Sequence, residues 1–106
     1  MKPDPFTAAN RRRWKERIEW MRDEHPADKP IRVMRTSRLS TGDCADCGTH
    51  YQIRIARQPD SFTMSVHLLL HEWAHALEPE GDDHSPAFWH ALGVLYNADE
   101  TYCQED

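Results

Sequence analysis

The chain has 106 residues, of which 29% are charged and 39% hydrophobic, with a formal net charge of -5 at pH 7. This length predicts a single domain over residues 1–106, with a thin core under a heavily solvated surface. No apolar run reaches the roughly 20 residues that cross a membrane, and the N-terminus lacks a signal-peptide pattern, so we expect a soluble, cytoplasmic protein. The negative charge argues against nucleic-acid binding by this domain, because phosphate contacts need a positive surface.

The first predicted element is a helix over residues 7–24. Its apolar stripe recurs at helical spacing and consists of Trp14, Ile18 and Met21. His25-Pro26 marks its end, because a residue that precedes proline is disfavoured in the helical conformation. The sequence therefore opens with an amphipathic helix.

A basic run on this helix, Arg11-Arg12-Arg13 with Lys15, suggests contact with nucleic acid. The competing interpretation is a solvated helix face with Trp14 turned into the core. A run this short in an acidic chain is more typical of the second, which we favour.

Two strands are predicted after this helix. The first covers Ile31–Thr36, where apolar residues 31 and 33 alternate with residues 32 and 34. The second covers residues 51–57, with Tyr51, Ile53 and Ile55 inward and Gln52, Arg54 and Ala56 outward. Between them lie turn signals at Gly42-Asp43 and Cys47-Gly48, and a short middle strand is predicted around residues 38–40. We expect these strands to form a small antiparallel sheet.

The next helix contains the most informative residues of the chain. Its apolar face is formed by Phe62, Val66, Leu69, Leu70, Trp73 and Leu77. Asp60 or Ser61 provides the N-cap after Pro59, and Pro79 pushes Glu78 out of the helical conformation. A helix of three to four turns, packed along one side, is predicted.

This helix carries His71-Glu72-Trp73-Ala74-His75, an H-E-x-x-H motif. Two histidines four residues apart lie about 40° apart around a helix, so both rings can reach one metal ion. The glutamate beside the first histidine then faces the open coordination position as a general base. We predict a Zn²⁺ site with His71 and His75 as ligands and Glu72 as the catalytic base.

A hydrolytic zinc site usually has three protein ligands. The candidates after the helix are Glu78, Glu80, Asp82, Asp83 and His84. We favour His84, because Ser85-Pro86 reads as the N-cap and first turn of a closing helix that would hold it rigidly. That helix has a packing face of Phe88, Leu92 and Leu95, with Trp89 and Tyr96 beside it. Asp83 is the main competitor.

The motif and the run Asp83-His84-Ser85-Pro86-Ala87-Phe88-Trp89 resemble the core of SprT-like and related minimal gluzincin-type metallopeptidases. The resemblance covers residues 71–89 and implies a zincin-like α+β domain: an N-terminal helix, a small sheet, the motif helix and a closing helix. It implies the zinc ligands His71, His75 and His84, with Glu72 as base. Short stand-alone relatives occur in bacteria and phages, which implies a cytoplasmic or host-cell location.

The expected function is therefore zinc-dependent hydrolysis of peptide bonds. A polypeptide substrate is expected to pair as an extended strand with an exposed edge of the 51–57 strand. Candidates for the oxyanion donor are Tyr51, Tyr96, Tyr102 and several histidines. Two alternatives remain: a zinc-stabilised interaction module without catalysis, which does not explain Glu72, and an acidic protein binder, which predicts no bound zinc.

The remaining histidines and cysteines are assigned secondary roles. His67 is expected at the rim of the site or behind a ligand, and His90 on the surface. Cys44 and Cys47 have zinc-knuckle spacing, but a structural site needs four ligands and there is no second pair. The alternatives are a redox-labile disulfide between Cys44 and Cys47 and a second metal site completed by Cys103 and His50. We expect Cys44 and Cys47 to be free thiols in a loop.

Overall fold

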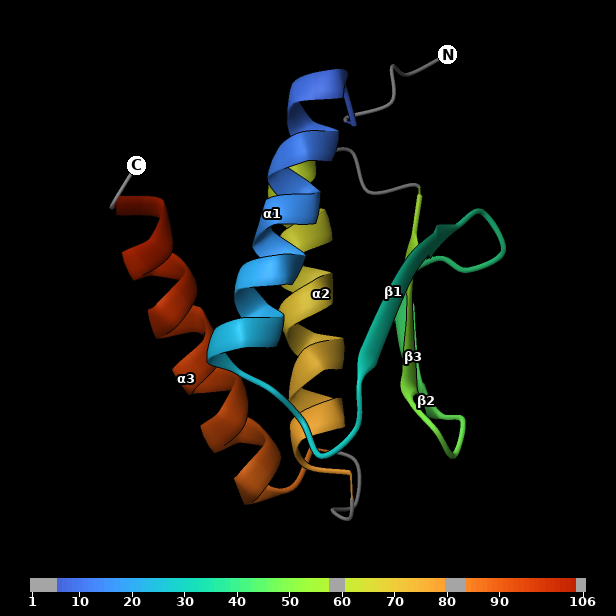
Figure 1. Cartoon of the computed structure of the whole chain (residues 1–106), viewed down its shortest axis with the longest axis vertical. Coiled ribbons are helices and arrows are strands. Elements are labelled where there is room, and N and C mark those ends of the chain that lie inside the picture. The colour runs from blue at the N-terminus through green and yellow to red at the C-terminus, as the bar shows by residue number, and fades with distance from the viewer. Residues whose placement is uncertain (1–5, 58–60, 80–83, 105–106) are drawn as a thin grey trace.

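The computed structural model describes residues 6–57, 61–79 and 84–104. Its elements are α1 (Ala8–Glu24), β1 (Ile31–Thr36), β2 (Gly42–Asp46), β3 (Tyr51–Ala56), α2 (Phe62–Leu77) and α3 (Pro86–Gln104). The helices lie on one side of the sheet, and α2 contacts β2, β3 and α3 (Figure 1). The predicted α+β class and element order are therefore confirmed.

The sheet is mixed, so the prediction of an antiparallel sheet is wrong. Its strand order is β1-β3-β2, with β1 parallel to β3 and β2 antiparallel to it. The most apolar strand, β3, takes the centre, where Tyr51, Ile53 and Ile55 are buried. Because β2 returns the chain along the far side of β3, β1 and β3 run in the same direction.

The middle strand lies at Gly42–Asp46 and not at residues 38–40 as predicted. Gly42 belongs to this strand and not to a turn. A Cβ atom on Gly42 would lie 2.9 Å from the Arg54 carbonyl oxygen, so glycine permits a close approach of β2 to its neighbour. The second predicted turn is confirmed: Gly48 has φ +87°, and its N–H donates to Asp46 Oδ1 at 2.9 Å.

The end of β3 also differs from the alternating pattern. Ala56 was predicted to face outward, but it is fully buried, and Arg57 falls outside the strand. The Ala56 N–H donates to the Thr41 carbonyl at 2.7 Å. Because β1 and β2 flank β3, the connection between them crosses this end of β3, where the small residue Ala56 is buried.

Helix α1 folds as its sequence predicts. Thr7 caps it by accepting from the Asn10 N–H, and His25 closes it by donating its N–H to the Met21 carbonyl. The buried stripe contains Trp14, Ile18 and Met21, as expected, together with Arg17. The basic run at residues 11–13 is exposed and Trp14 is buried. Exposure fits both interpretations of this run and does not distinguish them.

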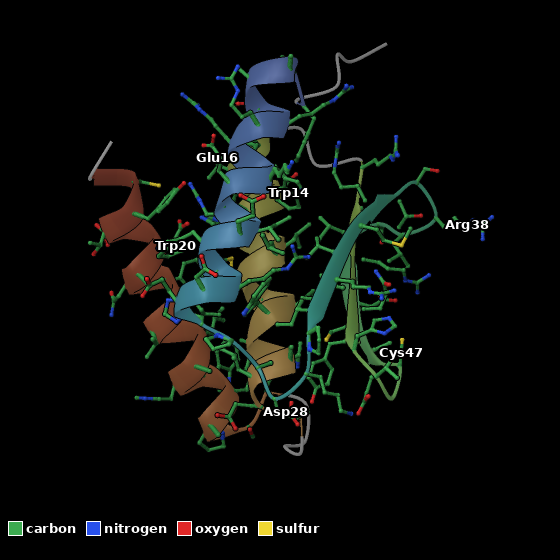
Figure 2. All side chains as sticks on the ribbon, in the orientation of Figure 1. Trp14, Glu16, Trp20, Asp28, Arg38 and Cys47 are labelled. Atoms are coloured by element: carbon green, nitrogen blue, oxygen red, sulfur yellow. The ribbon has the colours of Figure 1, made fainter. Side chains whose placement is uncertain are left out.

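Three aromatic rings hold the starts of the first two helices together. Phe6 contacts Trp14 at 5.2 Å and Phe62 at 5.6 Å between ring centroids. Figure 2 shows the Trp14 side chain on α1.

No helix of the described ranges is long and apolar enough to cross a bilayer.

Candidate metal centre

Helix α2 holds the two motif histidines in place. Ser61 caps its start by accepting from the Met64 N–H at 3.1 Å, whereas Asp60 lies outside the described residues. At its end, Glu78 leaves the helical conformation with φ -127° and ψ 65°, as its position before Pro79 predicts. Between these ends, one side of the helix is buried, which leaves His71 and His75 half-buried on another side.

The rotation of α2 is fixed by Trp73, the central residue of the motif. Its ring is fully buried and its Nε1–H donates to the His25 carbonyl at 2.9 Å, at the end of α1. Because Trp73 points toward α1, the histidines two residues before and after it are directed elsewhere. The helix cap of one element thus orients the candidate ligands of another.

His84 lies immediately before Ser85, the N-cap of α3. Ser85 caps that helix by accepting from the Phe88 N–H at 3.2 Å, as the Ser-Pro pair predicts. His84 itself has φ +61°. It is the only non-glycine residue of the described ranges with a positive φ. An L-residue adopts this left-handed conformation only at a cost, and such residues cluster at functional sites. Here the conformation turns the ring back toward α2.

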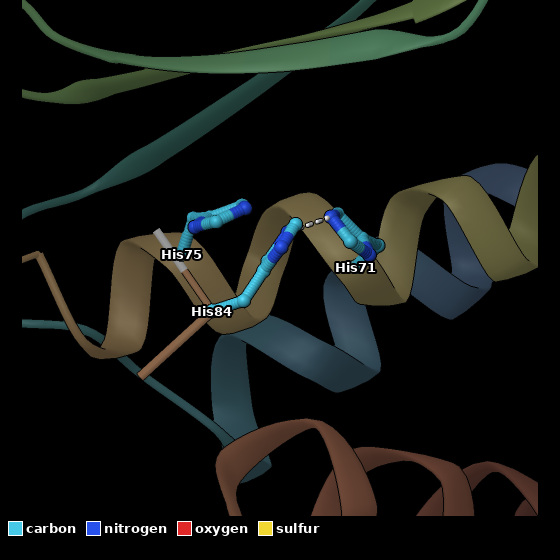
Figure 3. A group of neighbouring side chains, drawn as sticks. All are labelled: His71, His75 and His84. Atoms are coloured by element: carbon cyan, nitrogen blue, oxygen red, sulfur yellow. Dashed lines mark hydrogen bonds between the residues drawn. The ribbon is translucent and has the colours of Figure 1, made fainter. Parts of the chain in front are cut away.

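The three rings converge on one point (Figure 3). His84 Nε2 lies 3.3 Å from His71 Nε2, and one nitrogen from each of His71, His75 and His84 lies within 4.8 Å of the others. Tetrahedral zinc with bonds of about 2.0–2.1 Å to nitrogen separates its ligand atoms by about 3.3 Å. The three nitrogens are therefore spaced as ligands of one metal ion, and an all-imidazole donor set suits zinc.

Phe88 supports all three histidines, a role that the sequence analysis did not assign to it. Its ring is 1% exposed and stacks on His75 at 4.4 Å between centroids. It also lies 5.1 Å from His71 and 4.9 Å from His84. Its place four residues after His84, on the first turn of α3, was the signal available in the sequence.

The environment favours the form of His71 that can bind a metal. Burial lowers the pKa of His71, and the nearby rings of His75 and His84 lower it further. The neutral imidazole is therefore favoured over the charged one, and only the neutral ring has a lone pair to donate to a metal.

Glu72 and the histidines share a cleft between α2 and β2. Glu72 is 7% exposed and lines this cleft together with His71, His75, His84 and β2 residues 42–44. A Cβ on Gly42 would lie 3.3 Å from Glu72 Cγ, so the strand backbone passes directly over the glutamate. Sequence reasoning missed Gly42 because Gly42-Asp43 resembled a turn.

The strand beside the cleft is β2, so the prediction that the edge of the 51–57 strand is exposed is wrong. β3 is paired on both sides, whereas β2 has a strand partner on one side only within the described residues. The most apolar strand was expected at an edge, but burial of its side chains favours the centre of the sheet.

The other candidate ligands divide into two groups. Glu80, Asp82 and Asp83 lie outside the described residues. Glu78 lines the cleft, but the metal-binding group found among the described residues contains histidines alone. Cys44, Cys47 and Cys103 do not join it. All three are free thiols, as expected for Cys44 and Cys47, but Cys44 lies in β2 and not in a loop.

The tyrosines proposed for the oxyanion are not equivalent. Tyr51 lines the cleft, but its hydroxyl donates to Asp28 Oδ1 at 2.6 Å, which, with burial, raises its pKa to about 12. Tyr96 contacts His67 at 5.4 Å, and Tyr102 contacts Trp20 at 4.7 Å between ring centroids. His67, which contacts Tyr96, is not among the residues that line the cleft. His90 is exposed, as predicted.

No family model, curated protein or solved structure matches the chain. The resemblance to SprT-like peptidases therefore rests on the motif residues alone.

Proposed function

We propose that the protein is a zinc-dependent hydrolase that cleaves peptide bonds. The observation that carries this proposal is the convergence of three histidine nitrogens beside a buried glutamate in one cleft. A purely structural zinc site usually has four protein ligands, whereas a catalytic site has three and keeps one position for water. Three histidines with an adjacent carboxylate match the catalytic arrangement.

Each residue has a definite task in this proposal. His71, His75 and His84 would hold the zinc ion, which lowers the pKa of a water molecule toward about 7 and polarises the scissile carbonyl. Glu72 accepts a proton from the attacking water and delivers it to the leaving nitrogen. Phe88 contacts all three imidazole rings and would help to hold them in place.

We further propose that the substrate is an extended polypeptide that pairs with the free edge of β2. Main-chain hydrogen bonds of this kind provide affinity with little dependence on sequence. Thr41, Gly42 and Cys44 line the cleft at this strand, so a peptide paired there would run past Glu72. This assignment replaces the edge of β3.

The test is a comparison of Glu72→Gln with Glu78→Gln. Both glutamates line the cleft, and both changes remove one carboxylate without changing side-chain size. Glu72→Gln should retain zinc and the fold but lower the cleavage of an unstructured protein about 10²–10⁴-fold, because glutamine cannot accept the proton. Glu78→Gln should cleave at close to the wild-type rate. Zinc content is measured by elemental analysis of the same samples.

Two results would contradict the proposal. Equal cleavage by the wild type and Glu72→Gln would remove this residue from the mechanism. A zinc-loaded wild type that cleaves none of several unfolded proteins would instead favour the zinc-stabilised interaction module.

A further inference from the structure

The net charge conceals a strong segregation of charge along the chain. All 13 Lys and Arg residues lie in residues 1–57, whereas residues 58–106 contain 10 of the 18 acidic residues and no Lys or Arg. The first segment therefore has a formal charge of +5 and the second of -10. The expectation that this domain avoids nucleic acid was based on the average of these two parts.

The fold gathers much of the positive charge at one end of the molecule. The start of α1, the ends of β1 and β3 and the start of α2 lie together there (Figure 1). Contacts join them: Arg35 lies over the Phe6 ring at 3.3 Å, and Arg57 N–H donates to the Thr36 carbonyl at 2.9 Å. We call this the basic end; its cations are Arg11, Arg12, Arg13, Lys15, Arg35, Arg38 and Arg57.

Two carboxylates of the described residues, Glu16 and Asp99, line a cleft with one of these cations, Arg13. Residues 6–15, 33–41, 54–57 and 61–66, which build this end, contain no Asp or Glu. The nearest strand carboxylate, Asp43, is paired with Arg54 through Arg54 Nε at 2.9 Å. Except for Arg35, which is half-buried, the cations of the basic end are exposed.

Two cations of α1 extend toward the sheet. Arg11 and Lys15 are four residues apart, and Arg22 lies seven residues beyond Lys15 on the same side of the helix. Arg22 Nε donates to the carbonyl of Ile31 at 3.1 Å, which shows that this side faces β1. Arg11 and Lys15 therefore lie on the edge of α1 nearest the sheet, toward Arg35 and the loop that carries Arg38.

The basic end is well separated from the metal centre. His75 lies 13 residues after Phe62 on α2, which is about 20 Å along a helix. This is roughly 2.5 times the Debye length at physiological salt, so the charges of the metal cleft have little influence on the field at the basic end. Arg38 and Cys47 mark the two opposite ends of the sheet in Figure 2.

We propose that the basic end binds the phosphate backbone of double-stranded nucleic acid without reading its sequence. Most of its cations are arginines, whose planar guanidinium groups match phosphate oxygens in two-bonded geometry. Single strands are bound largely by stacking of bases on exposed rings. The exposed aromatic side chains of the described ranges, Trp89 and Tyr96, lie on α3, which favours a duplex partner.

The experiment measures fluorescence anisotropy of a labelled DNA duplex of about 20 base pairs with the zinc-loaded full chain, between about 50 and 200 mM NaCl. Contact with about four phosphates gives a slope of about -3.5 for log K against log salt. Arg38→Gln/Arg57→Gln should weaken binding about tenfold or more. Lys29→Gln/Arg32→Gln removes the same charge at the other end of β1 and should change it less than about twofold.

Three results would overturn the proposal: no binding at low salt, equal weakening by the two double variants, or equally tight binding to vesicles of anionic lipid. Tighter binding of a single strand of the same length would overturn the choice of a duplex. Because the exchanged residues lie on the surface or in a loop, circular dichroism should confirm that all variants are folded.

Discussion

The two ends of this domain are built in different ways. At the metal end, two of three candidate ligands come from one turn of α2, and the third comes from the residue before the N-cap of α3. At the basic end, cations from α1, β1 and β3 meet through contacts between residues far apart in the sequence. The first arrangement depends on local helix signals, whereas the second depends on the sheet topology.

This difference shows that the net charge of the whole chain is a poor guide to the charge of either end. A net charge of -5 describes neither end, because cations and most carboxylates belong to different parts of the chain. Interactions between exposed charges are screened over about 10 Å at 0.1 M salt, so each end acts through its own charges. The proposals for the two ends are therefore independent, and they can be tested separately.

The largest expected effect is on zinc content. His84→Ala should lose most of the metal, because a site of three protein ligands becomes a site of two. His90→Ala, on the exposed side of the same region, should keep about one equivalent. Elemental analysis of protein purified without added metal distinguishes them. Loss of zinc in Asp83→Ala with retention in His84→Ala would make Asp83 the third ligand.

Removal of the metal should also lower stability. Zinc that binds the folded chain alone, at 100 times its dissociation constant, contributes about 2.7 kcal/mol. For a domain of this size, chelation should then lower the melting temperature by roughly 10 °C or more. Equal melting of apo and zinc-loaded protein would show that the metal does not hold α2 and α3 together.

The same chelation experiment sharpens the comparison between the two ends. Binding of duplex DNA at a temperature where the apo protein is still folded should be unaffected, because none of the seven cations of the basic end lines the metal cleft. A parallel loss of zinc and DNA affinity would show that the ends are coupled.

The sequence predicted the metal end well because its signals are local. The cap at Ser61, the break at Glu78 before Pro79 and the Ser85-Pro86 start of α3 fix both helices. They also bring His84 back to His71, as expected. The left-handed conformation of His84 could not be predicted, because it depends on how the two helices pack.

The sheet was predicted less well because strand order depends on contacts between distant residues. Alternation located β1 and β3, but it contains no information on which strand lies between the others. The sequence Gly42-Asp43 is typical of a turn, yet Gly42 is needed inside β2 for the close approach to Glu72. The correct edge strand beside the cleft followed only from the observed order β1-β3-β2.

A smaller effect is expected from Gly42→Ala. The added methyl would lie 2.9 Å from the Arg54 carbonyl oxygen and 3.3 Å from Glu72 Cγ, so β2 or Glu72 must shift. A misplacement of about 1 Å at a reacting group can cost about 10²-fold in rate. We expect cleavage to fall by about that factor while zinc content stays constant.

Gly93→Ala is the matched control for that variant. Gly93 is on α3 with nothing within 4 Å of an added Cβ, so the same change should stabilise the helix by up to about 1 kcal/mol and leave cleavage unchanged. Unaltered cleavage in Gly42→Ala would show that Glu72 does not depend on the close approach of β2.

The smallest effect concerns the reactivity of the thiols, of which Cys44 lines the metal cleft. Burial raises the pKa of Cys44 to about 12, and the charges of Glu72, Asp43 and Asp46 contribute to that rise. A raised pKa leaves the thiol protonated at pH 8, and the protonated form is a poor nucleophile. Iodoacetamide at this pH should therefore alkylate the exposed Cys47 and Cys103 first and Cys44 slowly. Mass spectrometry of peptides from a time course gives the three rates. A Cys44 rate equal to the other two would mean that β2 does not cover the cleft in solution, and Glu72 would then lack the buried setting described for the metal end.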